Sequence, residues 1–177
     1  MIRIGQLNAR HSMAVWTLLE KEAKERGLDV VTVQEPPTYA STHQGKWGGY
    51  TFFFGRGSPP QVAICVKNTM RVQSLSVVGK RACGVVVERG VQIAIVCAYT
   101  RHTTGEGHEE LSLLLRVAQE CAPSTILCAD CNGHSPLWGP LSTRLDAVGK
   151  IIEEIVVEGN LVVLNHSDSP PIFWGGR

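Results

Sequence analysis

The stretch "ILCADCNGHSPLWG", residues 126–139, places an apolar run directly before a polar loop. The run predicts a buried β-strand, because short apolar segments that end at turn-forming residues are typical of such strands. Four polar residues follow at once: Asp130, Asn132, His134 and Ser135. Polar groups at the carboxyl end of a strand are where layered α/β folds build their sites, so this loop is the first candidate for a functional site.

Around this loop, the chain predicts an alternation of strands and helices that is typical of an α+β fold with two β-layers and helices outside them. The pattern predicts the first layer to be rich in antiparallel hairpins and the second to consist of strand-helix-strand units, with three visible strands. Strands are expected at residues 2–7, 29–34, 50–54, 61–67, 72–78, 83–88, 91–99, 125–129 and 161–165, and helices at 12–26, 106–121 and 144–158.

Size and composition indicate one ordinary globular domain. The chain has 177 residues, of which 44% are hydrophobic and 19% charged, and this excludes disordered and fibrous classes. Its longest apolar run, "VQIAIVCAY", is too short to cross a bilayer, and no secretory leader follows Met1, so no membrane is expected. Cysteines inside apolar strands predict free thiols and a nuclear or cytoplasmic location. The net charge of +1 neither supports nor excludes binding to a polyanion such as DNA.

Polar residues follow four of the predicted strands. The set consists of Asn8, Glu35, Tyr99, and Asp130 with Asn132. If the strand ends converge, two carboxylates, two carboxamides and a phenol share one cleft, and such oxygen-rich clusters suit Mg²⁺. Each residue also has a simpler interpretation as a helix cap, a solvated acid, a strand tyrosine or a turn former. The combination favours a common site.

Four motifs, "QLNAR", "VQEP", "CAYT" and "CADCNGHSPLWG", resemble in order and spacing those of the exonuclease-endonuclease-phosphatase superfamily, which includes apurinic/apyrimidinic endonucleases and DNase I. The last motif is most similar to the endonuclease domain of non-LTR (LINE-type) retrotransposons and argues against the superfamily's lipid phosphatases. The resemblance implies a four-layer α/β/β/α sandwich and a DNA endonuclease that uses Mg²⁺, or Mn²⁺ in its place, and acts with a reverse transcriptase.

The resemblance also implies roles for the residues that match its motifs. Glu35 would be the principal Mg²⁺ ligand, with Asn8 beside it. Asp130 would orient or deprotonate the attacking water, Asn132 would hold that water and the phosphate, and Tyr99 would bind the scissile phosphate. This division of labour fits phosphodiester hydrolysis, which requires in-line attack and relief of charge on the non-bridging oxygens.

Neighbouring residues are candidates for contacts with flanking DNA phosphates. They are His134, Ser135, Arg10, Arg101 and His102. For His134 and Ser135 the alternative is a role in stabilising the loop, and for the cations it is ordinary surface charge. Two of the positions depart from the DNA-repair members of the superfamily, which often carry an acid where this chain has Arg10 and Asn where it has His102.

The sequence also departs from the superfamily pattern near residue 177. Members continue into a strand with a further Asp and a closing Ser-Asp-His, and neither follows Trp174. We therefore expect residues 1–177 to be a single domain that lacks its C-terminal strands, leaves its second sheet incomplete and is weakly active or inactive. An alternative is a catalytically dead nucleic-acid-binding remnant. A further alternative is a structural zinc site at Cys128, Cys131 and His134, although no fourth ligand is evident.

Overall fold

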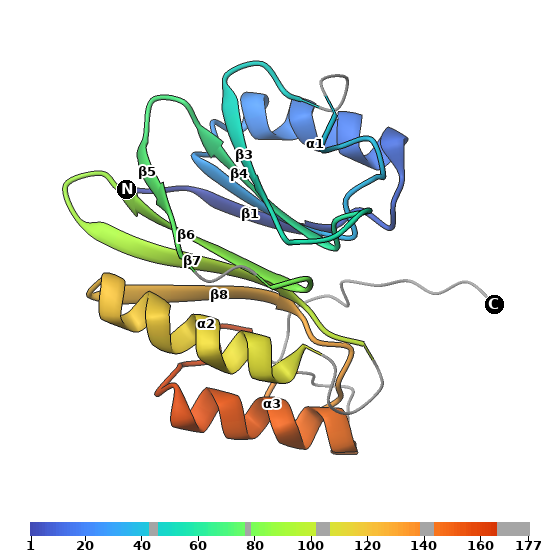
Figure 1. Ribbon diagram of the computed structural model, residues 1–177, viewed down its shortest axis with the longest axis vertical. Coiled ribbons are helices and arrows are strands. Elements are labelled where there is room, and N and C mark those ends of the chain that lie inside the picture. Colours follow the sequence, from blue (N-terminus) through green and yellow to red (C-terminus); the bar gives the residue numbers. More distant parts are fainter. Residues whose placement is uncertain (43–45, 77–78, 102–106, 139–143, 166–177) are drawn as a thin grey trace.

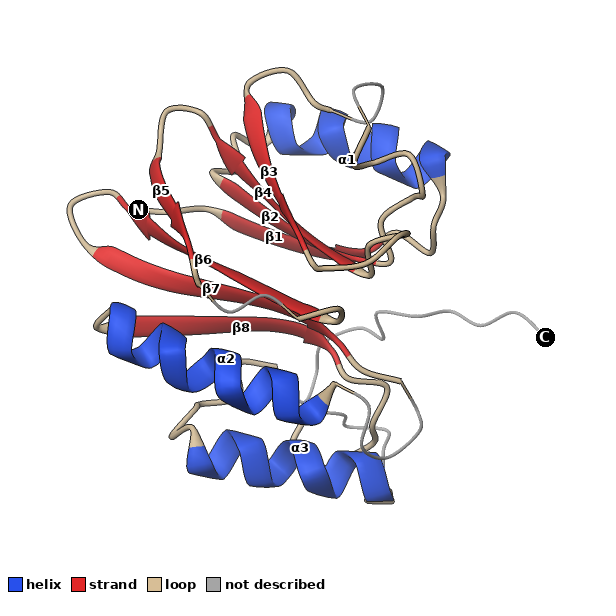
Figure 2. Ribbon diagram, in the orientation of Figure 1, coloured by secondary structure: helices blue, strands red, loops and turns tan. Residues whose placement is uncertain are grey.

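The computed structural model describes residues 1–42, 46–76, 79–101, 107–138 and 144–165. They form four layers, in the order helix, sheet, sheet, helices (Figure 1). One helix covers the outer face of the first sheet, and two helices cover the outer face of the second (Figure 2). The predicted four-layer α+β sandwich is therefore confirmed.

The first sheet has the strand order β1-β2-β4-β3. Its strands are β1 (Ile4–Asn8), β2 (Val30–Gln34), β3 (Tyr50–Phe54) and β4 (Val62–Lys67). The parallel pair β1 and β2 is joined by α1 (Met13–Glu25), whose first turn is capped by the Ser12 hydroxyl. Gly27 follows the helix with φ of +62°, a conformation that glycine adopts without steric cost, and the chain turns there into β2.

The second sheet has the order β5-β6-β7-β8. Its strands are β5 (Arg71–Ser74), β6 (Ala82–Glu88), β7 (Gln92–Tyr99) and β8 (Ser124–Asp130). The parallel pair β7 and β8 is joined by α2 (His108–Cys121), and α3 (Ala147–Glu158) follows β8 on the same face.

Three apolar layers hold the four structural layers together. Fully buried β-branched side chains such as Ile64, Val85 and Ile95 fill the space between the sheets. Burial of each contributes about 1.5–3 kcal/mol to folding. An aromatic cluster secures α1, with the Trp16 and Trp47 ring centroids 4.7 Å apart. Leucines of α2 and isoleucines of α3 pack on the outer face of the second sheet.

Three expectations about the strands were wrong. The second sheet has four strands in the described residues, where three were expected. Each sheet combines a parallel pair with antiparallel partners, so hairpins and strand-helix-strand units are not segregated into different layers. The segment 161–165 is described and is not a strand. An apolar run becomes a strand only where a neighbouring strand supplies hydrogen bonds, and this segment is paired with no described strand. Its side chains Val162 and Leu164 are 81% and 75% exposed. Within the described ranges, no helix is long and apolar enough to cross a membrane.

Candidate active site

The carboxyl ends of both parallel pairs lie at the same end of the sandwich. Hydrogen bonds between the sheets fix this superposition: Gln6 of β1 donates to the Ala129 carbonyl of β8 at 3.0 Å. The fully buried Gln34 of β2 donates to the Cys128 carbonyl at 3.1 Å. The last residues of β1 and β2 are therefore held against the end of the second sheet.

Asn8 and Asp130 form the first cross-sheet pair. The Asn8 amide donates from Nδ2 to Asp130 Oδ2 at 2.8 Å, and Asn8 Oδ1 accepts from the backbone N–H of Arg10 at 2.8 Å. Because the carboxylate can only accept and the backbone N–H can only donate, these partners determine the orientation of the amide. Asn8 thus fixes the position of the Asp130 carboxylate.

Glu35 and Tyr99 form the second cross-sheet pair. The Tyr99 hydroxyl donates to Glu35 Oε1 at 3.0 Å. Burial raises the pKa of Tyr99 above its ordinary value of 10.0, and the hydrogen bond to Glu35 and the negative charges of Glu35 and Asp130 raise it further. Tyr99 therefore stays a neutral hydrogen-bond donor at physiological pH.

Asn132 is held between these pairs by its own hydrogen bonds. Its Nδ2 donates to the Thr100 carbonyl at 2.7 Å, and it forms a side-chain hydrogen bond with Tyr99. Thr100 is 1% exposed and donates from its hydroxyl to the Cys131 carbonyl, so it fastens the start of the loop after β8 to the end of β7. The structure brings together all five residues expected at the strand ends.

The backbone around these side chains is strained. The φ values lie between +47° and +57° at four residues: Arg10, His11, Glu35 and Asn132. This left-handed conformation costs about 1–2 kcal/mol for a residue other than glycine. Glu35 is kept in it by hydrogen bonds on both sides, from His11 N–H to its carbonyl and from its own N–H to the Gln61 carbonyl, each 2.8 Å. Strain of this kind concentrates at functional sites.

The loop after β8 rests on the first turn of α3. Asp146 caps that helix by accepting from the Gly149 N–H at 2.6 Å and also contacts His134 Nδ1 at 2.7 Å. The Gly149 hydrogen bond is the main cause that lowers the pKa of Asp146 to about 2, and the His134 hydrogen bond adds to it. A Cβ atom at Gly149 would stand 2.0 Å from the His134 carbonyl oxygen, so only glycine allows this contact.

The residues expected to contact flanking phosphates lie in different environments. Arg10, Arg101 and His134 are exposed beside the two cross-sheet pairs. Ser135 is fully buried and donates to Glu153 of α3 while accepting from Leu137 N–H, so its hydroxyl stabilises the loop and does not reach a DNA phosphate in this conformation. His102 lies outside the described residues.

The side chains fit a hard cation better than zinc. Within the described ranges, no group of three or more His, Cys, Asp and Glu side chains is arranged to hold a metal ion, and Cys128, Cys131 and His134 do not form such a group. Mg²⁺ needs fewer protein ligands, because one or two carboxylates suffice when water and substrate phosphate complete its shell. Glu35 and Asp130 provide two carboxylates among amide and phenol groups.

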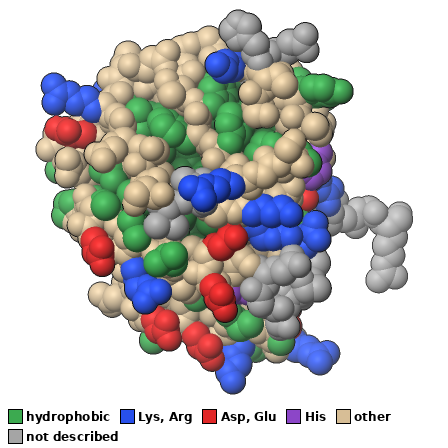
Figure 3. Space-filling view, viewed as in Figure 1, with side chains coloured by type: hydrophobic (Ala, Val, Ile, Leu, Met, Phe, Trp, Pro, Cys, Tyr) green, Lys and Arg blue, Asp and Glu red, His purple; other side chains and the backbone are tan. Residues whose placement is uncertain are grey.

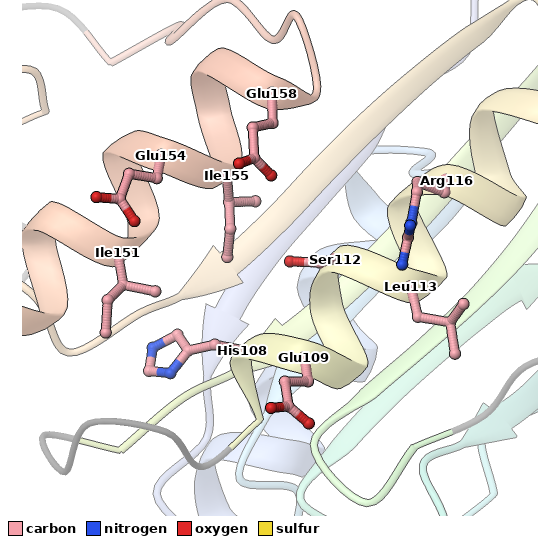
Figure 4. A pocket seen from close by; sticks show the side chains of 9 residues that line it. All are labelled: His108, Glu109, Ser112, Leu113, Arg116, Ile151, Glu154, Ile155 and Glu158. Carbon is pink, nitrogen blue, oxygen red and sulfur yellow. The ribbon is translucent and has the colours of Figure 1, made fainter.

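A separate pocket of about 520 Å³ lies between α2 and α3, away from this site. Figure 4 shows Glu154 and Glu158 of α3 across the pocket from Glu109 and Arg116 of α2, with His108 at one end. His108 is 5% exposed, and neither ring nitrogen has a hydrogen-bond partner in the described part of the chain. Burial lowers its pKa from the ordinary value of 6.5.

We expect His108 to weaken the fold in acid. A lowered folded-state pKa means that the unfolded chain binds the proton more readily, so stability is lost as the pH falls below 6.5. His108→Phe keeps the apolar packing, removes the titration and loses no hydrogen bond. The fall in urea midpoint between pH 7.5 and pH 5.5 should therefore be smaller in His108→Phe than in the unaltered protein. An equal fall in both proteins would contradict this expectation.

Sequence reasoning missed the residues that support the site. Gln6 and Gln34 lie in the quoted motifs, but their partners are backbone carbonyls on the other sheet, which no local pattern reveals. Asp146 and Gly149 lie beyond the quoted stretch, and only the path of the chain brings α3 beneath the loop. Thr100 likewise belongs to a quoted motif, "CAYT", but its partner is the Cys131 carbonyl of the loop after β8.

Comparison with known proteins agrees with the resemblance drawn from the motifs. Residues 93–177 match the model of the family described as "Endonuclease-reverse transcriptase". The fold is that of the "Endonuclease domain of TRAS1, a telomere-specific non-LTR retrotransposon", at TM-score 0.80 and 24% identity over 96% of this chain and 76% of that one. A search of curated proteins finds no significant match.

The same fold recurs in more distant proteins. A humanized TDP2 of D. rerio superimposes at TM-score 0.55 and 17% identity, over 92% of this chain and 68% of that one. A mannosyl-6-phosphatase of Bacteroides thetaiotaomicron does so at TM-score 0.55 and 12% identity, over 86% and 69% of the two chains. These proteins therefore share the four-layer sandwich fold that the motifs led us to expect.

Proposed function

We propose that residues 1–177 belong to a single endonuclease domain that hydrolyses DNA phosphodiester bonds with Mg²⁺ and nicks the target site for retrotransposition. The main support for this proposal is that the Asn8–Asp130 and Glu35–Tyr99 pairs converge at one end of the sandwich. The match to a family described as "Endonuclease-reverse transcriptase" supports DNA as substrate and a reverse transcriptase as functional partner.

Glu35 and Asn8 would hold the metal. The Glu35 carboxylate is 21% exposed, and His11 Nε2 lies 3.6 Å from its Oε1. Asn8 Oδ1 uses one lone pair for the Arg10 N–H, and its second lone pair remains for a metal. When bound, Mg²⁺, or Mn²⁺ in its place, supplies positive charge that offsets the charge developing on the phosphate oxygens.

Asp130 accepts the proton of the attacking water in this proposal. Asn8 and the backbone N–H of Asn132 hold the two carboxylate oxygens by hydrogen bonds of 2.8 and 3.4 Å, so the carboxylate does not rotate freely. A carboxylate in a fixed direction accepts a proton only from a water on that side, and this sets the line of attack on phosphorus.

Tyr99 and Asn132 bind the phosphate. Tyr99 keeps its proton and can transfer its hydrogen bond from Glu35 to a phosphate oxygen that enters beside it. Asn132 is oriented by the Thr100 carbonyl. Arg10, Arg101 and His134 contact phosphates on either side, and Asp146 orients the His134 ring so that Nε2 faces outward.

A second candidate function is DNA binding without cleavage. It applies to the 177-residue polypeptide taken alone, because residues 1–177 contain no Ser-Asp-His sequence. The same site would then bind a phosphate group without hydrolysing it efficiently.

Both functions require DNA binding, and we expect it to be weak, assisted by Mg²⁺ and steeply dependent on salt. Each phosphate contact releases counterions, so the logarithm of the affinity falls with log[salt] by about 0.9 per contact on duplex DNA. Fluorescence anisotropy with a labelled duplex at 50–200 mM KCl, with Mg²⁺ or EDTA, measures this. An affinity that does not change over this range would refute phosphate recognition, and Mg²⁺-dependent nicking of supercoiled plasmid separates the two functions.

A further inference from the structure

Two loops of the sandwich reach the candidate site from strands that carry none of its residues. The β3–β4 loop ends at β4, where Val62 pairs with Gln34 and the Gln61 carbonyl accepts from Glu35 N–H. The β5–β6 loop ends at β6, where the Arg81 carbonyl accepts from Tyr99 N–H at 2.9 Å. One loop therefore adjoins each member of the Glu35–Tyr99 pair.

The two loops are joined to each other across the sheets. The Arg56 N–H donates to the Gly79 carbonyl at 2.8 Å. Gly55 approaches the Lys80 carbonyl so closely that a Cβ atom there would stand 3.0 Å from it. The side chain of Lys80 lies over Gly57, with Cγ 3.5 Å from the position of a Cβ atom. Arg56 and Lys80 are thus neighbours on one surface, which we call the Arg56–Lys80 surface.

Both cations are exposed and free to bind an anion. Within the described part of the chain, neither the Arg56 nor the Lys80 side chain forms a salt bridge or hydrogen bond. The carboxylate of Glu110 lies nearby, where it accepts from the Arg81 N–H at 3.2 Å. Lys and Arg side chains gather at the middle of the right side in Figure 3, the side on which the strand ends of both sheets converge in Figure 1.

We propose that the Arg56–Lys80 surface binds backbone phosphates of the DNA strand one to three nucleotides from the scissile phosphate. Strands of the two sheets face each other in a row across the sandwich: β1 faces β8, then β2 faces β7, then β4 faces β6. Neighbouring strands are about 5 Å apart, and a DNA strand carries one phosphate per about 3.4 Å of helix axis. The proposal rests on the proposed function, because the row starts at the scissile phosphate.

The test compares two pairs of substitutions that remove equal charge. Arg56→Gln with Lys80→Gln removes the proposed contacts, whereas Arg71→Gln with Lys67→Gln removes one Arg and one Lys at the opposite end of the sheets. Binding of a labelled duplex is measured by anisotropy in EDTA over a range of KCl concentrations, which excludes cleavage and metal effects. Circular dichroism confirms that each variant is folded.

We expect the first double variant to lose about 1.8 from the magnitude of the salt slope and about 10- to 100-fold in affinity near 0.1 M salt, as two phosphate contacts require. The second should bind like the unaltered protein, and Arg56→Lys should retain the slope. Equal losses in both double variants, or no loss in the first, would overturn the Arg56–Lys80 surface while leaving the proposed function intact. Absence of DNA binding by the unaltered protein would overturn both.

Discussion

Asp130→Ala is expected to lower DNA nicking by about 10²- to 10⁴-fold, the usual contribution of a positioned acid-base group. The experiment needs a chain that includes a Ser-Asp-His, so a C-terminal segment carrying that sequence is grafted after residue 177. Alanine removes the group that accepts the proton from water and leaves the Asn8 amide without its partner. Nicking of supercoiled plasmid in Mg²⁺ measures the loss.

Further substitutions separate the role of Asp130 from general damage. Glu35→Ala should also abolish nicking, because it removes the proposed metal ligand and the partner of Tyr99. Glu120→Ala removes a carboxylate from the exposed face of α2 and should leave nicking unchanged. Asn8→Ala should cost less than Asp130→Ala, since it releases the Asp130 carboxylate without removing it and leaves Glu35 to hold the metal. Nicking that survives Asp130→Ala within tenfold would exclude the proposed role of this residue.

Convergence of the site was predictable because it depends on strand direction. Asn8 and Glu35 end parallel neighbours, and Tyr99 and Asp130 are paired in register at the end of a second parallel pair. A strand, a helix and a second strand in succession indicate such a pair from local sequence alone. The facing of the two pairs across the sandwich followed only from the resemblance, because no local pattern encodes the inter-sheet hydrogen bonds of Gln6 and Gln34.

Long-range pairing accounts for what sequence reasoning missed. The segment 161–165 is as apolar as a strand, yet its backbone is not paired with any described strand. Ser135 stands beside exposed His134 in an equally polar loop, but the proximity of Glu153 buries it completely. Arg56 and Lys80 lie far apart in the sequence, and the hydrogen bond from the Arg56 N–H to the Gly79 carbonyl brings their loops together.

The 177 residues alone are expected to nick plasmid weakly or not at all, and the graft that carries a Ser-Asp-His is expected to restore nicking. The resemblance implies a closing Ser-Asp-His whose histidine is essential, and residues 1–177 contain no such sequence. Loss of one acid-base group accounts for about 10²- to 10⁴-fold in rate, so the 177-residue chain should nick more slowly than the graft by about this factor. A graft in which that histidine is replaced by alanine is the matched control and should stay inactive.

The opposite outcome would assign the missing role to a residue already in place. Strong nicking by the 177 residues, abolished by Asp130→Ala, would show that another group performs the work of the closing histidine. His134 is the first residue to test, because Asp146 holds its Nδ1 at 2.7 Å and the ring is 65% exposed beside the loop that carries Asp130. An aspartate that orients an imidazole in this way leaves Nε2 to exchange a proton with the substrate. His134→Gln would then abolish nicking, whereas in the grafted protein it should only weaken DNA binding.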